Sequence, residues 1–308
     1  RAHQFARDIA SRAGDSAAVA VHNARLTKIK NALFSELWVS TAGHPGLFRE
    51  QGGHQRLVNN PWLYSLCLPI EAAMLTPEQA ATTLHYSEYG LQNDVMPFGG
   101  RRVWTSNFTP SIWSTRILWP GDSYMLAQSF FQSGFARDGW DILRGTCLQS
   151  GFNDLVPGAS SVLVGGPDFG DCVHTLPRTI PEGLFGYQPD FPNGKARIAP
   201  QFPADWENAS MKTPDVKLKY SRAGNITTLE TRIQRTTTLE VDIPVRVSAV
   251  SSVTVNGTSS AFTTHPGFGN TIVRVSTPAT AGVTLTIAVT TGSPITEEQS
   301  ALAYGDVV

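Results

Sequence analysis

Cysteine is scarce in this sequence. The 308 residues contain three, Cys67, Cys147 and Cys172, and no two of them have CxxC spacing. At least one must stay unpaired, which argues against a disulfide framework and against a cysteine zinc site. We expect all three to be buried thiols. The histidines also lack HxH or HExxH spacing, so the sequence predicts no metal site and implies no cofactor.

Excess charge and long apolar runs are absent as well. The net charge is -1 at pH 7 and the sequence pI is near 6.7, so the chain has no basic field for a phosphate backbone and nucleic acid is a poor partner. No run approaches the roughly eighteen apolar residues of a membrane span, and no signal peptide is visible. The start RAHQFARDIASRAGD has no Met and is already helical in pattern, which is typical of a processed or truncated product. We expect a neutral ligand and no membrane partner.

An apolar content of 41% is enough for a sizeable core, and the length suggests roughly two domains. Up to about residue 190 the apolar residues favour helical spacing, interrupted by long loops rich in Gly, Pro and Trp. Asn60-Pro61 and Gly121-Asp122 precede helical segments, and a further helix is expected at 174–186. Thr76-Pro77-Glu78-Gln79 predicts a helix with a capping box that runs to about Tyr89. The first half is therefore predicted to consist of helical hairpins.

The pattern changes past about Gly194. Short runs such as VKLKYSR, ITTLETRIQ, TTTLEVDIPV and VTLTIAVTT alternate in polarity, are rich in Val, Ile and Thr, and are separated by turn residues. An antiparallel β-sandwich is the natural way to bury such strands.

The junction between the halves carries the most specific motif. A helix is expected to end in GLFGYQPDFPNG, the strand-like ARIAPQFPADWENAS follows, and VTVNG lies among the later strands. In this order, and above all from Gly186 to Pro200, the chain resembles the C-terminal portion of bacterial six-hairpin glycosidases, the (α/α)6-barrel enzymes that include α-L-rhamnosidases. The resemblance covers nearly the whole chain. It implies an α+β multidomain protein with part of an (α/α)6-type barrel at 1–190 and an antiparallel β-sandwich with its connector at 191–308.

The chain also departs from that family. The rhamnosidase-like "ATT-x-W-E" string, which carries the catalytic base there, is absent, and GGPDFGD at 165–171 stands before the last expected helix. A full barrel implies twelve helices of ~11 or 12 residues each, whereas this chain has room for about six or seven. We expect the missing N-terminal barrel portion to be another segment or another chain.

Glycoside hydrolysis usually employs two carboxylic groups, one as acid and one as base or nucleophile. The Gly-rich stretch GHPGLFREQGGHQR makes Glu50 the predicted general acid; the alternative is a surface loop in which Glu50 pairs with Arg49 or Arg56. Asp168 or Asp171 is predicted as the base, although Asp171 also suits the N-cap of the following helix. The resemblance implies that the reaction proceeds with inversion.

Loops that precede inner helices converge at one end of such a barrel, and further polar and aromatic residues of those loops are predicted to bind the sugar. Aromatic faces stack on sugar rings, and arginines suit hydroxyls or a uronate, although Trp also serves as a packing residue and Asp94 and Asp122 also suit an ion pair and a cap. The predicted binding residues are His44, Arg49, His54, Asp94, Arg101, Arg102, Trp104, Trp113, Trp119, Asp122 and His174.

The resemblance thus implies a glycoside hydrolase acting on a plant or microbial polysaccharide or oligosaccharide, and we expect it to be secreted or periplasmic. Two other classes stay open. A polysaccharide lyase would use Tyr86, Tyr89, His85, Arg101 and Arg102 near a uronate. A chain that lacks half of its barrel would also suit a glycan-binding or scaffold protein without activity.

Overall fold

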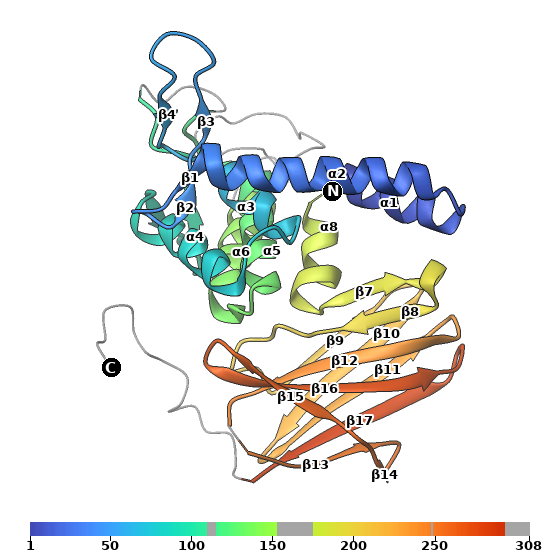
Figure 1. Cartoon of the computed structure of the whole chain (residues 1–308). Helices are drawn as coiled ribbons and strands as arrows, with labels where there is room; N and C mark the ends of the chain where they lie inside the picture. The colour runs from blue at the N-terminus through green and yellow to red at the C-terminus, as the bar shows by residue number, and fades with distance from the viewer. Residues whose placement is uncertain (110–114, 153–174, 248, 293–308) are drawn as a thin grey trace. The chain divides into compact units, whose positions relative to one another are not determined.

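The computed structural model describes residues 1–109, 115–152, 175–247 and 249–292, and shows helices followed by β-sheets (Figure 1). The chain divides into two compact units. The first contains Arg1–Ser133 and the described part of 141–173, and the second contains Gly134–Trp140 and the described chain after 174. No helix among the described residues is long and apolar enough to span a membrane. The expected α+β composition is confirmed.

The helices of the first unit fall where helical spacing predicts them. They are α1 (Ala2–Arg12), α2 (Ser16–Ala32) with the π-helical turn η1 (Leu33–Leu37), α3 (Leu63–Glu71), α4 (Pro77–Tyr89), α5 (Pro120–Gln132) and α6 (Ala136–Phe152), whose first residues, up to Trp140, belong to the second unit. The capping box at the start of α4 is confirmed: the Gln79 backbone N–H donates to the Thr76 hydroxyl at 3.2 Å, and the Thr76 N–H donates to the Gln79 side chain at 3.0 Å.

Helices α3 and α5 pack side by side and run in the same direction (Figure 1). At their starts the Trp62 indole N–H donates to Asp122 Oδ2 at 2.8 Å, and at their ends the Gln132 amide donates to the Ile70 carbonyl at 3.5 Å. Helix α4 lies between them in the sequence. This is the arrangement of helical hairpins whose inner helices are parallel, although the described residues form no closed barrel.

Within the described part of the chain, three two-stranded hairpins interrupt the helices, and the sequence did not predict them. They pair β1 (Trp38–Val39) with β2 (His44–Pro45), β3 (Phe48–Arg49) with β4 (Leu57–Val58), and β5 (Asn93–Val95) with β6 (Arg101–Val103). Strands of two or three residues are too short to show the alternation that identifies a strand in a sequence.

The helix expected at 174–186 is shorter and less regular than predicted. The structure has α8 (Leu176–Arg178) followed by a π-helical turn, η2 (Thr179–Leu184), and residue 174 lies outside the described residues. Pro181 lies within η2. Because proline has no backbone N–H, it interrupts the i→i−4 ladder of a regular α-helix.

The described residues of the second unit form two sheets, which Figure 1 shows layered face to face. One has the order β14-β13-β17-β11-β10-β9 and the other β15-β16-β12-β8-β7. Buried and more exposed side chains alternate along the strands, so that Leu239, Val241 and Ile243 of one sheet and Leu229 and Ile287 of the other are fully buried. The strands are β7 (Tyr187–Asp190), β8 (Lys195–Ile198), β9 (Asn208–Lys212), β10 (Val216–Ala223), β11 (Ile226–Ile233), β12 (Thr237–Val245), β13 (Val250–Val255), β14 (Thr258–Ser259), β15 (Thr263–Gly267), β16 (Asn270–Ala279) and β17 (Thr284–Thr291).

Two glycines at the entry to this unit make a matched test of close packing. Gly186 and Gly194 have nearly equal positive φ values, 65° and 66°. A Cβ on Gly186 would collide with the backbone of Ala199, whereas a Cβ on Gly194 would meet nothing within 4 Å. Both alanine variants should lose about 1 kcal/mol of unfolding free energy through the left-handed backbone, and Gly186→Ala should lose about 1–3 kcal/mol more through overpacking. Urea denaturation measures both, and equal losses would contradict the packing argument.

Candidate functional site

The loops that precede α3 and α5 are joined at the N-terminal ends of these helices. Besides the bond from Trp62 to Asp122, the Leu63 N–H donates to the Thr105 carbonyl at 3.0 Å, and the Thr105 N–H donates to the Ile117 carbonyl at 2.9 Å. The segments before α3 and before α5 therefore meet at one end of the helical unit, as predicted for loops that lead into inner helices.

Three of the predicted binding residues, Asp122, Arg102 and Trp119, are buried near this junction. Asp122 lies in the first turn of α5 with 1% exposure, and the N-cap of the helix is Trp119 and not Asp122. The Arg102 side chain has 0% exposure, and its Nη2 donates to the Leu118 carbonyl at 2.6 Å. Trp119 is buried as well. In this structure these side chains are buried and pack against the segments that lead into α3 and α5. Direct contact with the substrate stays a prediction for them.

Polar and aromatic side chains gather around the β5–β6 hairpin. The Trp104 indole N–H donates to Asp94 Oδ2 at 2.7 Å, and the Arg116 guanidinium lies over the Trp104 ring, 5.6 Å from its centroid. Arg116 also donates to the Gln92 side chain at 3.0 Å. Trp104 is only partly buried. It is therefore an aromatic ring held in place by charged neighbours on both its edge and its face.

Arg101, the first residue of β6, orders the other side of this hairpin. Its Nη2 lies 2.7 Å from Glu88 Oε1, and its Nη1 donates to Asn93 Oδ1 at 2.8 Å. The second oxygen of Glu88 lies 2.8 Å from His85 Nδ1. We call the set Glu88, Gln92, Asp94, Arg101, Trp104 and Arg116 the hairpin cluster. It combines an aromatic ring with hydrogen-bonding groups of both signs, a combination suited to a polyhydroxylated ligand.

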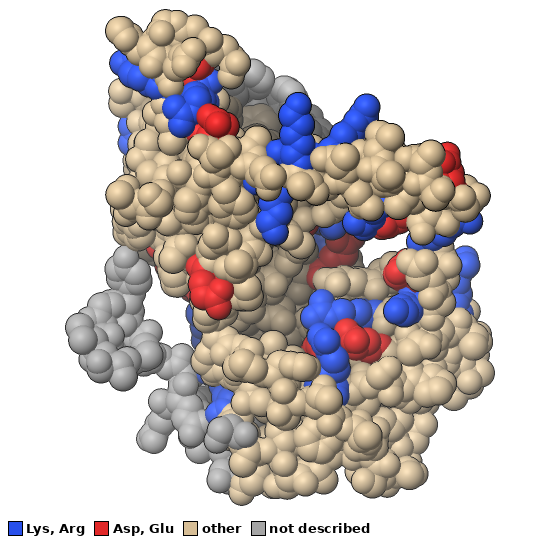
Figure 2. Space-filling model, in the orientation of Figure 1, with Lys and Arg blue, Asp and Glu red and all other residues tan. Residues whose placement is uncertain are grey.

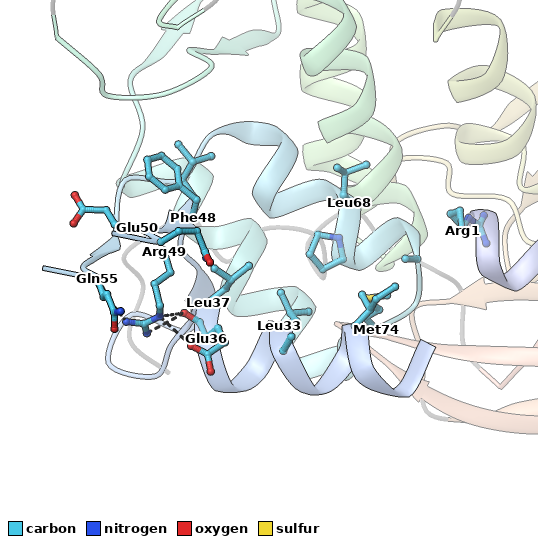
Figure 3. Close-up of a pocket in the computed structure, with 16 residues that line it drawn as sticks. Arg1, Leu33, Glu36, Leu37, Phe48, Arg49, Glu50, Gln55, Leu68 and Met74 are labelled. Atoms are coloured by element: carbon cyan, nitrogen blue, oxygen red, sulfur yellow. Dashed lines mark hydrogen bonds and ion pairs between the residues drawn. The ribbon is translucent and has the colours of Figure 1, made fainter. Parts of the chain in front are cut away.

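Glu50 directly follows β3, on the β3–β4 hairpin, and pairs with Arg56. Its Oε1 lies 3.2 Å from Arg56 Nη2, and its Oε2 accepts the Arg56 backbone N–H at 3.2 Å. Arg49 pairs with Glu36 at 3.1 Å (Figure 3), and His54 is exposed. The ion pair with Arg56 matches the alternative stated for this loop, and it does not exclude chemistry at the carboxylate.

Glu50 also lines one end of a groove of about 960 Å³ between α2 with η1 and α3 (Figure 3). We call it the α2–α3 groove. Its polar residues, among them Glu36, Arg49 and Glu50, lie mostly at that end. The rest of its wall is mostly aliphatic, including Ile29, Leu33, Leu37, Leu68, Pro69 and Met74, while Phe48 adds an aromatic ring and Arg1 a charge at the other end (Figure 3).

His44 has a structural environment. It is 1% exposed, its ring centroid lies 3.9 Å from that of Tyr86, and its Nδ1 lies 3.0 Å from the Pro45 carbonyl oxygen. Burial lowers the pKa of His44, and the bond to the Pro45 carbonyl offsets this only in part. The side chain is therefore a packing group in this structure, and its binding of a sugar stays a prediction.

Four predicted site residues cannot be placed. Trp113, Asp168, Asp171 and His174 lie outside the described residues. Among the residues that the structure does describe, no group of three or more His, Cys, Asp or Glu could hold a metal ion. On the face seen in Figure 2, Lys and Arg are interspersed with Asp and Glu and separated by large uncharged areas.

Gln92, Arg116 and Trp62 were missed in the sequence. Arg116 lies twelve residues after Trp104, and Trp62 contacts a carboxylate sixty residues away. No short motif joins either pair. The position of Trp62 gave the one available signal. It lies next to the start of a predicted helix, in a loop expected to converge with the loop before α5.

No protein-family model matches the sequence, and no curated protein matches it. Among solved structures, the fold is similar to that of glycoside hydrolases. An α-L-rhamnosidase from Dictyoglumus thermophilum matches 92% of this chain with a TM-score of 0.56 and 11% identity. A Streptomyces avermitilis α-L-rhamnosidase complexed with L-rhamnose matches 93% with a TM-score of 0.56 and 12% identity. A sialidase matches 88% with a TM-score of 0.53 and 11% identity.

This chain spans only part of those proteins, 30% of the first, 26% of the second and 25% of the sialidase. At such low identities the similarity concerns the fold alone. It extends over both the helices and the sheets, because about nine-tenths of the chain is aligned in each case.

Proposed function

We propose that this chain is part of a six-hairpin glycoside hydrolase that cleaves a sugar unit from a plant or microbial polysaccharide or oligosaccharide. The observation that carries the proposal is the hairpin cluster, whose Trp104 directly precedes Thr105, the residue that joins the segments before the parallel helices α3 and α5. The fold similarity to α-L-rhamnosidases over most of the chain supports it. In this proposal Trp104 stacks on a sugar ring, while Asp94 and Arg101 bind hydroxyl groups.

The proposed chemistry uses two carboxyl groups. Glu50 donates a proton to the leaving glycosidic oxygen as its bond to the anomeric carbon breaks. Asp168 or Asp171 takes a proton from the water whose oxygen bonds to that carbon on the opposite face, so the configuration inverts. Glu50 precedes α3, and Asp94, Trp104 and Arg116 precede α5. The segments before these two helices are joined at Thr105, which is the support for placing the acid in this loop.

A lyase is less well supported, because its proposed base has the wrong environment. The Tyr86 ring packs against His44 and Tyr89, and burial, followed by the influence of Tyr89, raises the pKa of Tyr86. A tyrosine that abstracts a proton needs a pKa nearer to the working pH.

Product analysis tests the class of activity. The protein is incubated with a panel of plant and microbial glycans, and the products are analysed by mass spectrometry and by NMR of the first-formed anomer. We expect products that have gained one water per bond cleaved, with inverted configuration. Unsaturated sugars would assign a lyase instead, and glycans that are bound but unchanged would assign a binding protein.

Trp104 provides the test of the binding site. Trp104→Ala should weaken glycan binding about tenfold or more, since it removes the apolar surface that the sugar would cover, and fully burying a large apolar side chain contributes roughly 1.5–3 kcal/mol. Trp104→Phe keeps a ring but loses the bond to Asp94, so it should retain most of the affinity. Isothermal titration with a non-hydrolysed oligosaccharide measures both variants. If Trp104→Ala binds as the wild type does, the hairpin cluster is not the sugar site.

A further inference from the structure

The outer face of one sheet of the second unit carries a row of positive charges. Lys217 on β10 lies directly opposite both Lys212 on β9 and Arg232 on β11 in the antiparallel register. Adjacent strands are about 4.8 Å apart, so the backbones of the three residues lie within roughly 10 Å. The next residue on β10, Leu218, is buried, so the side chains of the row point away from the core of the sandwich. Three cations therefore share one small area of surface, which we call the basic row.

The basic row lines an open groove of about 380 Å³, together with Lys219 and Glu230. Lys219 and Glu230 form an ion pair at 3.6 Å. Among the described residues, no acidic side chain forms an ion pair with Lys212, Lys217 or Arg232. The groove thus has an excess of positive charge, although the whole chain has a net charge of -1.

The basic row lowers the stability of the sheet unless an anion is present. Like charges directly opposite each other on neighbouring strands are destabilising. Lysine on an edge strand protects against aggregation, and this accounts for Lys212, since β9 is an edge strand of the described sheet. It does not account for Lys217 and Arg232, because β10 and β11 are paired on both sides. The Nε of Arg232 is also buried without a hydrogen-bond partner among the described residues, so the fold leaves part of this guanidinium unsatisfied.

The neighbours of the basic row indicate the kind of anion. Thr284 of β17 lies opposite Arg232, Ser210 of β9 lies opposite Lys219, and both hydroxyl residues line the groove. Cations next to hydroxyl groups suit a ligand that carries both carboxylates and hydroxyl groups. None of the described residues that line the groove is aromatic, so the bases of a single-stranded nucleic acid would have no ring on which to stack.

We propose that this groove binds a carboxylate-bearing polysaccharide, with the basic row holding carboxylates and Ser210 and Thr284 holding hydroxyl groups. The groove belongs to the second unit, whereas the hairpin cluster belongs to the first. It binds the polymer without cleaving it, and a second attachment point of this kind raises the effective concentration of the chain at the protein. The choice of a polysaccharide over another polyanion rests on the proposed glycoside hydrolase function, whereas the anion site itself does not.

Binding of polygalacturonate to the purified 308-residue chain tests the proposal, with neutral galactan as the polymer that lacks carboxylates. Isothermal titration at low salt measures both, because salt screens exposed charges. We expect the wild type to bind polygalacturonate and not galactan. The double variant Lys217→Gln/Arg232→Gln should bind about tenfold or more weakly, since it removes two charge-assisted contacts. The control Lys28→Gln/Lys30→Gln removes the same net charge from exposed lysines of α2 and should bind as the wild type does.

Urea denaturation separates a binding role from a structural one. Lys217→Gln relieves the repulsion within the basic row, so it should unfold at a urea concentration equal to or higher than that of the wild type. A lower midpoint would show that the row stabilises the fold, and would overturn the proposal.

Equal affinity of the wild type and Lys217→Gln/Arg232→Gln for polygalacturonate would also overturn the proposal, as would equal losses in the two double variants, which would mean that net charge alone drives binding. Two further probes would overturn it in favour of another partner. Poly-L-glutamate bound as tightly as polygalacturonate would assign an acidic peptide, and phosphatidylserine vesicles bound in place of polygalacturonate would assign a membrane surface. None of these results bears on bond cleavage, which product analysis tests separately.

Discussion

Glu50→Gln should lower turnover of the natural glycan about a hundredfold or more, because glutamine keeps the shape of the side chain but cannot donate an acidic proton. The fold should be unaffected. Glu50 is partly exposed and its pair with Arg56 has a side-chain exposure of 70% on the arginine, so losing that ion pair should change the unfolding free energy by less than about 1 kcal/mol. Turnover and thermal denaturation of the same preparation separate the two effects.

Glu36→Gln is the matched control. Glu36 also lines the α2–α3 groove and pairs with an arginine, Arg49, at 3.1 Å. It has no proposed role in proton transfer, so this variant should keep wild-type turnover. Wild-type activity in Glu50→Gln would remove Glu50 as the acid and leave Asp94 as the next candidate. It would not by itself decide the class of reaction, which product analysis tests separately.

The second large effect is expected in the β-sandwich. Asp242 on β12 has a side-chain exposure of 3% and holds two arginines, Arg197 of β8 at 2.6 Å and Arg274 of β16 at 2.7 Å. Asp242→Ala leaves both guanidiniums without this shared carboxylate. Breaking a buried pair costs about 3–5 kcal/mol. We expect a loss of about 3 kcal/mol, at the low end, because both arginines are partly solvated. Urea denaturation at pH 7 measures it.

The contacts of Asp242 with its two arginines also make this loss of stability depend on pH. Burial alone would raise the pKa of Asp242, but the hydrogen bonds from Arg274 and Arg197 outweigh it and hold the pKa below its usual value. The folded-state pKa is thus lower than the unfolded one, so the stabilisation is present above the unfolded value of about 3.9 and is lost as the pH falls through the folded-state value. The difference between wild type and Asp242→Ala should shrink accordingly in acid.

Glu240→Ala is the control for this prediction. Glu240 reaches the same arginines at 3.7 and 3.5 Å, but its side chain is 40% exposed. An exposed pair of this kind contributes about 0–1 kcal/mol. An equal loss in the two variants would mean that the burial of Asp242 is not what makes its contacts strong.

Local patterns in the sequence predicted those elements whose cause is local. The capping box at Thr76 and the alternating runs that became β10, β11, β12 and β17 depend on residues a few positions apart, and the structure confirms them. The short hairpins β1–β6 and the π-helical turns were not predicted. The hairpins pair too few residues to show an alternating pattern, and the change that a proline makes in a helix leaves the spacing of the apolar residues unchanged.

In the candidate site, too, only the residues that lie close together in the sequence could be predicted. Asp94, Arg101 and Trp104 were predicted because they lie close together in a loop with polar and aromatic residues. Their partner Arg116 and the bond from Trp62 to Asp122 come from positions that only the folded chain brings together. Burial could not be foreseen for His44 either, since its surroundings come from Tyr86, 42 residues later in the sequence.

One pairing in the second unit bears on how this protein can be divided. Strand β8 runs parallel to β12, with Lys195 opposite Thr238 and Ile198 opposite Val241, while all other pairs in that sheet are antiparallel. The connector therefore supplies two of the five strands, β7 and β8, to a sheet whose central strand follows some forty residues later. A fragment beginning at residue 191 would lack β7 and leave the edge of β8 open to aggregation. The sandwich therefore cannot be transferred to another protein as a domain that starts at residue 191. A transferred domain must include the residues from Gly186 onward.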